Sequence, residues 1–291
     1  MAPPTFDLQS HSTCSDGALA PRDVVAAAEA AGVELLALSD HDTVDGVDEA
    51  LEAAAARRLA VVPATELSAI HGEREDLHVL GYRLDHRSAA LLDVLATFRA
   101  DRDARARRMV AALREAGFEL ELPDRGGKPV GRPHLAHAAF EHPANRMRLR
   151  EEGIVNFSQL LEAYLVPGAP AYRRRTTPTV AEAIAAIHDA GGVAVWAHPF
   201  WDLDADDDVL ALIDRFAAAG LDGVEAFYAT HTEAQTRLVA EHCAARGLLT
   251  TGSADFHGPD HPRFNAFRAF ELHGLEPNLG PIRPGSRSAA D

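Results

Sequence analysis

The residues of this chain that could do chemistry are histidines and carboxylates that follow short apolar runs. Four stretches have this form, at residues 6–17, 35–42, 193–199 and 248–257. Each begins as an apolar run of strand length and ends in His, Asp or both. Packing alone gives no reason for four strands to end in metal-ligand residue types. We therefore expect a functional site where these strand ends converge.

Eight residues are the candidate metal ligands of that site. Imidazoles and carboxylates without a thiolate are typical of Zn²⁺, Mn²⁺ or Fe²⁺ in an open hydrolytic centre. Five imidazoles and three carboxylates exceed what one ion can bind, so the pattern predicts two to three divalent ions. Adjacent ions can hold a hydroxide and clamp both the attacking and the leaving oxygen of a phosphate. All the candidates lie at or just past a predicted strand end except His78, which lies inside one; they are His11, Asp16, His41, Glu66 (the expected bridge between ions), His78, His198, Asp255 and His257.

Other sources of catalytic chemistry are missing from the sequence. It contains no Gly-rich phosphate loop, no Gly-x-Ser-x-Gly elbow and no Cys nucleophile followed by Arg. Three more carboxylates, Asp7, Asp40 and Asp42, are expected to orient ligands or cap the backbone rather than to bind metal. The chemistry is therefore expected to come from the metal ions.

The elements that must position these residues alternate between strand and helix. Helices are predicted at 21–31 and 45–58, and strands at 33–38, 60–64 and 77–82, which favours a largely parallel sheet with helical crossovers. The alternation resumes at residue 177, and an edge strand is expected at 267–272. About seven such units favour a closed or nearly closed barrel, in which functional residues gather at the carboxyl ends of the strands. The later helices are expected at 177–190, 206–219 and 231–246, and the later strands at 193–197, 222–227 and 248–252.

The middle of the chain has a different texture. Residues 88–170 contain no apolar run of the kind that predicts strands elsewhere in the chain. They are expected to form a long helix at 88–117 followed by short helices at 133–141 and 156–165. The sequence thus predicts a discontinuous barrel, 1–87 with 171–275, interrupted by a helical insertion at 88–170. The tail at 276–291 is rich in Pro, Gly, Ser and Arg and is expected to be disordered.

Composition limits the partners of this 291-residue chain. A net charge of −16 argues against a stable complex with nucleic acid through a broad basic face. It leaves room for a phosphorylated substrate, because bound metal ions invert the local potential. Two cysteines form no disulfide framework, the N-terminus has no signal-like pattern, and no apolar run is long enough to cross a bilayer. We expect a cytoplasmic protein with no membrane partner.

The motifs as a whole resemble those of the PHP (polymerase and histidinol phosphatase) family. Within it they are most similar to the stand-alone phosphoesterases that resemble the bacterial 3',5'-nucleotide bisphosphate phosphatases. The matching segments are Asp7-Leu8-Gln9-Ser10-His11 with Ser15-Asp16-Gly17, Ser39-Asp40-His41-Asp42, the lone Glu66, His78-Val79-Leu80-Gly81, Ala197-His198-Pro199 and Ser253-Ala254-Asp255-Phe256-His257.

The resemblance implies a distorted (β/α)₇ barrel of PHP type with up to three metal ions. It also implies a metal-bound hydroxide as the attacking group, with no protein nucleophile. Carried over by motif, the three ligand sets are His11, Glu66 and Asp255; Glu66, His78 and His198; and Asp16, His41 and His257. Family relatives also carry phosphate contacts at positions that correspond to Arg132, His134 and His231.

The sequence departs from the family pattern at two places. Gln9 stands where the opening motif has its first His, and an amide oxygen is a weaker ligand than imidazole, so one ion is expected to bind loosely or to be missing. Some relatives have Gly-Arg after Ala-His-Pro, where this chain has Phe200-Trp201 and so lacks a phosphate-binding charge. The candidates to replace that charge are Arg173, Arg174 and Arg175, and those to stack on a base are Tyr172 and Trp201.

These observations predict a metal-dependent phosphomonoesterase. Its expected substrate is a nucleotide such as a 3',5'-bisphosphonucleoside, or the 5' end of an oligonucleotide. The alternatives are a histidinol-phosphate-type phosphatase, an amidohydrolase-like C–N hydrolase and a non-catalytic metal-binding domain. Amidohydrolases usually need a carbamylated lysine, and the only lysine here is Lys128 in the insertion.

Overall fold

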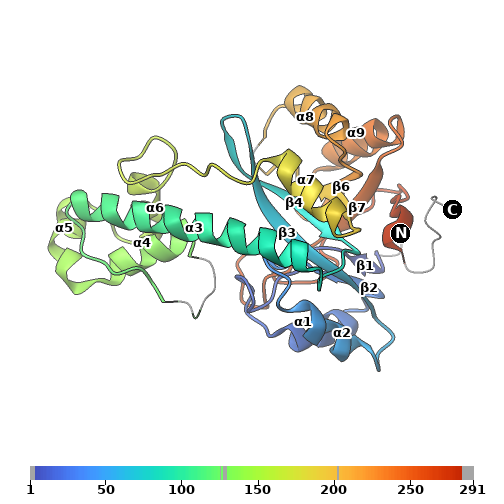
Figure 1. Cartoon of the computed structure of the whole chain (residues 1–291), viewed down its shortest axis with the longest axis horizontal. Helices are drawn as coiled ribbons and strands as arrows, with labels where there is room; N and C mark the ends of the chain where they lie inside the picture. Colours follow the sequence, from blue (N-terminus) through green and yellow to red (C-terminus); the bar gives the residue numbers. More distant parts are fainter. Residues whose placement is uncertain (1–3, 125, 127–129, 202, 284–291) are drawn as a thin grey trace. The chain divides into compact units, whose positions relative to one another are not determined.

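The computed structural model describes residues 4–124, 126, 130–201 and 203–283, and the chain forms two compact units (Figure 1). The first unit contains Met1–Leu95 and Pro178–Asp291, and the second contains Ala96–Thr177. The boundary falls inside the long helix α3 (Ala89–Glu115), not at its start. That residues 88–170 form a separate inserted domain therefore stays a prediction.

The first unit is built around one sheet whose seven strands lie in chain order. The pairs β1–β2, β2–β3, β5–β6 and β6–β7 are parallel. The sheet is nearly closed, because the amide of Leu8, just after β1, donates to the carbonyl of Gly252 in β7 at 3.2 Å. This arrangement confirms the barrel-like fold. The strands are β1 (Phe6–Asp7), β2 (Leu35–Leu38), β3 (Ala60–His71), β4 (Arg74–Tyr82), β5 (Val193–Trp196), β6 (Gly223–Tyr228) and β7 (Leu249–Ser253).

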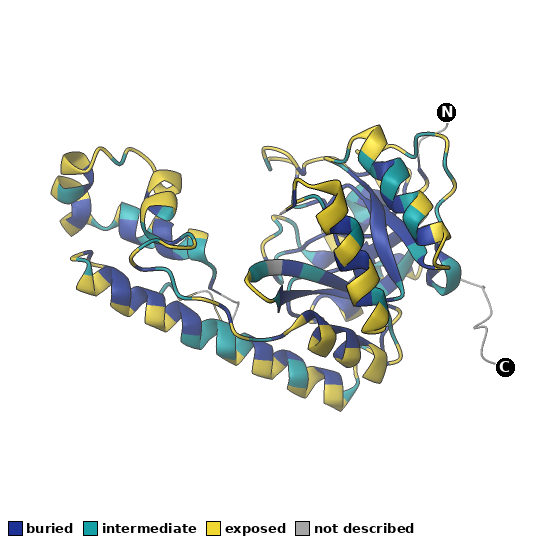
Figure 2. Ribbon diagram, turned by 90° about the horizontal axis from the view of Figure 1, so that it is seen from above, coloured by how far each residue is buried: buried dark blue, intermediate teal, exposed yellow. Residues whose placement is uncertain are grey.

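Amphipathic helices connect the parallel strands and turn their buried sides toward the sheet (Figure 2). Local signals explain where they begin: Pro21 opens α1, and the pairs Thr179–Glu182 and Thr232–Gln235 form capping boxes at α7 and α9. The helices between parallel strands are α1 (Pro21–Ala30), α2 (Val47–Ala54), α8 (Asp206–Ala218) and α9 (Glu233–Ala244), and α7 (Val180–Asp189) precedes β5.

The direction of β4 departs from a repeating βα pattern. No helix separates β3 from β4; a short turn with Gly72 at φ 57° joins them into an antiparallel hairpin, and β4 is also antiparallel to β5. β3 is longer than the predicted 60–64 and pairs first with β2 and then with β4. Glu66, expected just past a strand end, therefore lies inside β3, as His78 lies inside β4.

Tyr82, at the end of β4, ties that strand to the loop after β1. Its side chain is fully buried, and its hydroxyl donates to the carbonyl of Leu8 at 2.9 Å. The contact holds the backbone immediately before Gln9 and His11.

Tyr82→Phe should lower the free energy of unfolding by about 1–3 kcal/mol, because it leaves a buried carbonyl without this donor. Urea denaturation followed by circular dichroism measures the change. The matched control is Tyr164→Phe, whose hydroxyl donates to exposed Glu152 at 2.8 Å, and which should cost about 0.5 kcal/mol or less. Equal losses in the two variants would contradict the role given to Tyr82.

The second unit is helical and has its own core. The buried side of α3 packs on short helices through residues such as Leu113, Phe118 and Leu135. Asn145 is buried between them and donates to the carbonyls of Glu119 and Ala139. The short helices are α4 (Arg132–Glu141), η1 (Pro143–Asn145), α5 (Arg146–Glu151) and α6 (Phe157–Tyr164).

Two predictions about the C-terminal region are wrong. Residues 267–272 form no strand, although Phe267 and Phe270 are buried. The predicted disorder of 276–291 fails for 276–283, where η2 (Gly280–Ile282) buries Ile282 and the carbonyl of Asn278 accepts from the amide of Thr250 in β7. Residues 284–291 lie outside the described residues. Within the described part of the chain, no helix has both the length and the apolar character needed to cross a membrane.

Candidate metal centre

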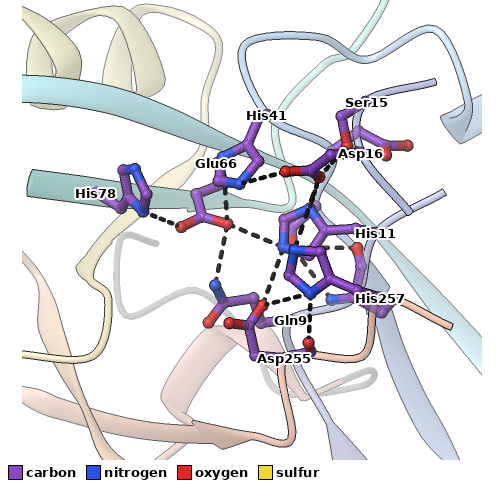
Figure 3. Close-up of polar contacts among 12 residues, drawn as sticks. Gln9, His11, Ser15, Asp16, His41, Glu66, His78, Asp255 and His257 are labelled. Atoms are coloured by element: carbon purple, nitrogen blue, oxygen red, sulfur yellow. Dashed lines mark hydrogen bonds and ion pairs between the residues drawn. The ribbon is translucent and has the colours of Figure 1, made fainter. Parts of the chain in front are cut away.

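Segments that follow four strands bring most of the predicted ligands to one end of the sheet. The β3–β4 hairpin adds the other two from within its strands (Figure 3). The residues are His11 and Asp16 after β1, His41 after β2, Glu66 in β3, His78 in β4, His198 after β5, and Asp255 with His257 after β7.

Glu66 lies at the centre of this cluster, and its side chain is fully buried. Its Oε2 lies 3.1 Å from Nε2 of His11 and 3.7 Å from Nδ1 of His41. Its Oε1 lies 2.7 Å from Nδ1 of His78 and 3.3 Å from Nε2 of His198. One carboxylate thus touches four imidazoles from four segments, which is the placement that a bridging ligand needs.

Two further carboxylates complete the cluster. Asp16 Oδ1 lies 3.8 Å from Nδ1 of His11 and 3.6 Å from Nε2 of His257, and its Oδ2 lies 3.6 Å from Nε2 of His41. Asp255 Oδ1 lies 3.1 Å from Nε2 of His11 and 3.6 Å from Nδ1 of His257. His11 is therefore placed between all three carboxylates.

Three sets of ligand atoms lie close enough together to hold an ion, with all atoms of a set within 4.8 Å of one another. One set equals a trio implied by the family resemblance, one adds His11 to such a trio, and one contains His41 in place of His198. His198 remains adjacent, with its Nε2 3.3 Å from Nδ1 of His78. The sets are His11, Glu66 and Asp255; His11, Asp16, His41 and His257; and His41, Glu66 and His78.

Unsatisfied polar atoms support a metal at this place. Among the described residues, both ring nitrogens of His11, Nδ1 of His41 and Oδ1 of Asp255 are buried without a hydrogen-bond partner. Buried polar groups are nearly always paired. Imidazole nitrogens and a carboxylate oxygen that point into a shared space are the donors that Zn²⁺, Mn²⁺ and Fe²⁺ accept. The residues therefore fit a group of divalent ions.

Two donors of the cluster, His41 and Glu66, are held in the form that binds metal, whereas the carboxylates of Asp255 and Glu66 raise the pKa of His11 despite its burial. Burial lowers the pKa of His41 to about 4, so this imidazole is neutral at pH 7 and has a free lone pair. Burial alone would raise the pKa of Glu66, but the imidazoles of His41 and His78 hold it well below its usual range. Metal ligands must be deprotonated, and these two groups already are.

Backbone strain occurs at two of the predicted ligands and beside a third. His198 has φ 29°, Asp255 has φ 55° and Asp42, beside His41, has φ 55°. Side chains other than glycine rarely adopt positive φ, and such strain persists only where the surroundings enforce it. Holding these three residues in position therefore costs the fold some of its stability.

Gln9 does not point its amide oxygen at the cluster. Its buried side chain donates from Nε2 to Oε2 of Glu66 at 2.9 Å, while its Oε1 accepts from the hydroxyl of Ser253 at 3.3 Å. The prediction treated Gln9 as a weak ligand. In the structure its amide holds the central carboxylate in place instead.

Sequence reasoning missed two buried groups beside the cluster. Glu225 in β6 accepts from the amide of His198 at 3.0 Å and from the hydroxyl of Ser253 at 2.6 Å, and burial holds its pKa well above the usual range. The hydroxyl of Tyr228 donates to Oδ2 of Asp255 at 2.7 Å. Both lie within the predicted strand 222–227 or just after it, where an acidic residue in an otherwise apolar strand was the available signal.

Three other carboxylates behave as orienting groups. Asp40 accepts from the amide and hydroxyl of Ser12, and Asp42 accepts from the amide of Ser68. Asp7 accepts from the amide of Ala254 at 3.0 Å, next to Asp255. Each fixes a backbone segment that carries a predicted ligand, as loops at an active site require.

The predicted phosphate contacts fall in different units. His231 lies in the first unit, with Nδ1 3.1 Å from the carbonyl of Ala226 and Nε2 buried without a partner among the described residues. Burial lowers the pKa of His231 to about 4. Arg132 and His134 lie in the second unit at the start of α4, where Nδ1 of His134 accepts from the amide of Gly131 at 2.9 Å. Their roles as phosphate contacts stay predictions.

Curated relatives match nearly the whole chain. A 3',5'-nucleoside bisphosphate phosphatase from Chromobacterium violaceum is 33% identical over 87% of this chain and 87% of its own length. A 5'-3' exoribonuclease from Haemophilus influenzae is 32% identical over 87% of this chain and 90% of its own. The family model described as the PHP domain matches residues 7–119.

Solved structures share the fold over about nine-tenths of both chains. One, described as an amidohydrolase from C. violaceum with bound sulfate and no metal, has a TM-score of 0.74 and 32% identity and covers 91% of each chain. Another, described as a candidate metal-dependent phosphoesterase from Bifidobacterium adolescentis, has a TM-score of 0.72 and 29% identity and covers 90% of this chain and 91% of that one. The chain therefore belongs to the PHP-domain family and is a hydrolase of its metal-dependent phosphoesterase group.

Proposed function

We propose that this enzyme hydrolyses a phosphomonoester of a nucleotide, such as a 3',5'-bisphosphonucleoside or the 5' end of an oligonucleotide. The observation that carries the proposal is the buried carboxylate of Glu66 in contact with four imidazoles, with Asp16 and Asp255 also beside His11. The names of relatives that are 32–33% identical support a nucleotide substrate.

The residues that would hold two to three Mn²⁺, Zn²⁺ or Fe²⁺ ions are the eight predicted ligands. Ions bound there would supply Lewis-acid charge to the phosphate and activate a water molecule. The chain contributes placement: Gln9 fixes Glu66, Tyr228 fixes Asp255, and Asp40 fixes the Ser12 loop. No protein nucleophile is proposed.

Gln9 should limit the number of ions, because its Nε2–H occupies the side of Glu66 where the family has an imidazole. Gln9→His should raise the Mn²⁺ content by about one ion per chain, since imidazole is a better ligand than an amide. Metal analysis after reconstitution measures this, and Gln9→Ala is the control, with no expected gain. An unchanged metal content in Gln9→His would contradict the role given to Gln9.

The test of the proposed function is turnover of the full chain, reconstituted with Mn²⁺, on a panel of phosphomonoesters. The panel contains 3',5'-bisphosphonucleosides, nucleoside 5'-monophosphates, a 5'-phosphorylated oligonucleotide, histidinol phosphate and p-nitrophenyl phosphate. Release of phosphate from the nucleotides in preference to the last two would support the proposal. Preference for histidinol phosphate would replace it.

One alternative keeps a specific observation in its favour, because a structure with 32% identity is described as an amidohydrolase. Lys128, the only lysine of the chain, lies outside the described residues. Hydrolysis of cyclic amides without phosphate release from the panel would favour that alternative. Bound metal without any turnover would favour a binding domain.

The expected location in the cytoplasm belongs to the same proposal. It is supported by Cys14 and Cys243, which form no disulfide, since a reducing compartment keeps thiols in this state.

A further inference from the structure

Trp201 is an aromatic side chain at the rim of the metal centre with no part in holding the ligands. It follows β5 by a tight turn in which its amide donates to the carbonyl of His198 at 2.9 Å. Its ring lies 6.2 Å from the ring of His198 and 5.7 Å from that of Phe264. The indole is 46% exposed, whereas Trp196, the other tryptophan, is 1% exposed.

Arg263 lies over this indole, with its guanidinium carbon 5.5 Å from the ring centroid. Arg263 is an exposed residue. It comes from the segment after β7, which packs on the centre through Phe264, 5.7 Å from the ring of His257. A positive charge thus lies beside Phe200-Trp201, the place where the sequence lacks the arginine of some relatives.

We infer that Trp201 is a stacking platform for the nucleobase of the substrate and that Arg263 binds a second phosphate of the same nucleotide. This inference rests on the proposed function and names the part of the substrate that is not hydrolysed. In a nucleotide, one ribose separates the base from the phosphate. The ring of Trp201 lies 6.2 Å from that of His198, so a base on Trp201 would leave the phosphate near the metal centre.

The energetics favour exchange of the guanidinium for a base. An exposed cation–π contact is weak, and stacking of a base on an aromatic side chain is stronger. A guanidinium that leaves the ring face stays tethered beside it, where it can form charge-assisted hydrogen bonds with phosphate. Since every base has a π face, the platform should tolerate all four bases.

The experiment compares a nucleotide with its base-free counterpart. The full chain, with and without Mn²⁺, is titrated with adenosine 5'-monophosphate and with ribose 5-phosphate, and binding is followed by calorimetry. Trp201→Ala should weaken binding of the nucleotide by about 5- to 150-fold and leave ribose 5-phosphate within about twofold. The matched control is Phe157→Ala, which removes an aromatic ring that is 39% exposed in the second unit and should change neither affinity.

A second variant and a spectroscopic signal test the two halves separately. Arg263→Gln should weaken adenosine 3',5'-bisphosphate about tenfold more than the monophosphate, as loss of one charge-assisted hydrogen bond implies. Nucleotide binding should quench the fluorescence of Trp201, and Trp201→Phe should abolish that quenching, because only buried Trp196 remains.

An unchanged ratio of nucleotide to ribose 5-phosphate affinity in Trp201→Ala would overturn the stacking role of Trp201. So would a failure of the wild-type chain to bind the nucleotide both with and without Mn²⁺. Equal losses for bis- and monophosphate in Arg263→Gln would overturn the second-phosphate role. Failure of the proposed function looks different: nucleotide preference and quenching would persist, but Mn²⁺-loaded protein would release no phosphate.

Discussion

Glu66→Gln should reduce turnover of every phosphomonoester by at least about 100-fold. Residues that merely orient metal ligands typically cost about 10- to 100-fold when mutated, and Glu66 contacts four imidazoles directly. The substitution keeps the volume of the side chain but removes the charge that the ions share. Phosphate release and metal content, measured on the same sample after reconstitution with Mn²⁺, should fall together.

The matched control is Glu241→Gln, because Glu241 is an exposed residue of α9 in the same unit. It should retain both turnover and metal. Circular dichroism and the urea midpoint establish that Glu66→Gln is folded. Normal turnover in a folded Glu66→Gln enzyme would rule out a metal centre around this carboxylate.

Removal of metal with a chelator should abolish turnover and lower the midpoint of thermal unfolding by several degrees. An ion present at 100 times its dissociation constant stabilises the folded state by about 2.7 kcal/mol. In a chain of this size, each kcal/mol corresponds to roughly 2–4 °C. Without ions, the buried atoms of His11, His41 and Asp255 lack partners, and the carboxylates of Glu66 and Asp255 repel each other.

Two controls separate loss of metal from damage. Addition of Mn²⁺ after removal of the chelator should restore both turnover and the midpoint. In Glu66→Gln, the midpoint should respond much less to the chelator, because the ions are already weakly held. Identical midpoints of the wild-type chain with and without Mn²⁺ would contradict stabilisation by metal, whatever the activity.

Local sequence patterns were sufficient for most of the elements. The helix predicted at 21–31 is α1 at Pro21–Ala30, and the strand predicted at 193–197 is β5 at Val193–Trp196. Proline at a first turn, glycine as a stop and runs of alternating character act within a few residues. These signals do not depend on the rest of the chain, so the sequence alone reveals them.

The direction of a strand is not a local property. Residues 77–82 carry the apolar pattern of a buried strand whether they run parallel or antiparallel to their neighbours. The antiparallel choice follows from the short connection at Gly72, and from pairing with β5, more than 100 residues later. Pairing of β3 with β4 extends β3 to His71 and so places Glu66 inside a strand.

The C-terminal errors have a similar cause. Phe267 and Phe270 are apolar because they pack against the barrel, not because they pair in a sheet; Phe270 lies 5.6 Å from the ring of Phe6. Polar composition predicted a disordered tail, but Asn278 exchanges hydrogen bonds with Thr250 on β7. Composition does not show whether a polar segment will form hydrogen bonds with a strand of the sheet.

The sequence by itself determined the kind of residue at the centre, because metal-ligand types follow strand after strand at one end of the sheet. Tertiary structure alone decided what each one touches. Gln9 turns its amide nitrogen to Glu66 because Ser253, 244 residues away, takes its oxygen. Tyr228 and Glu225 reach Asp255 and His198 only because β6 lies between β5 and β7. These contacts join residues far apart in the chain, and closure of the sheet, not any local pattern, brings them together.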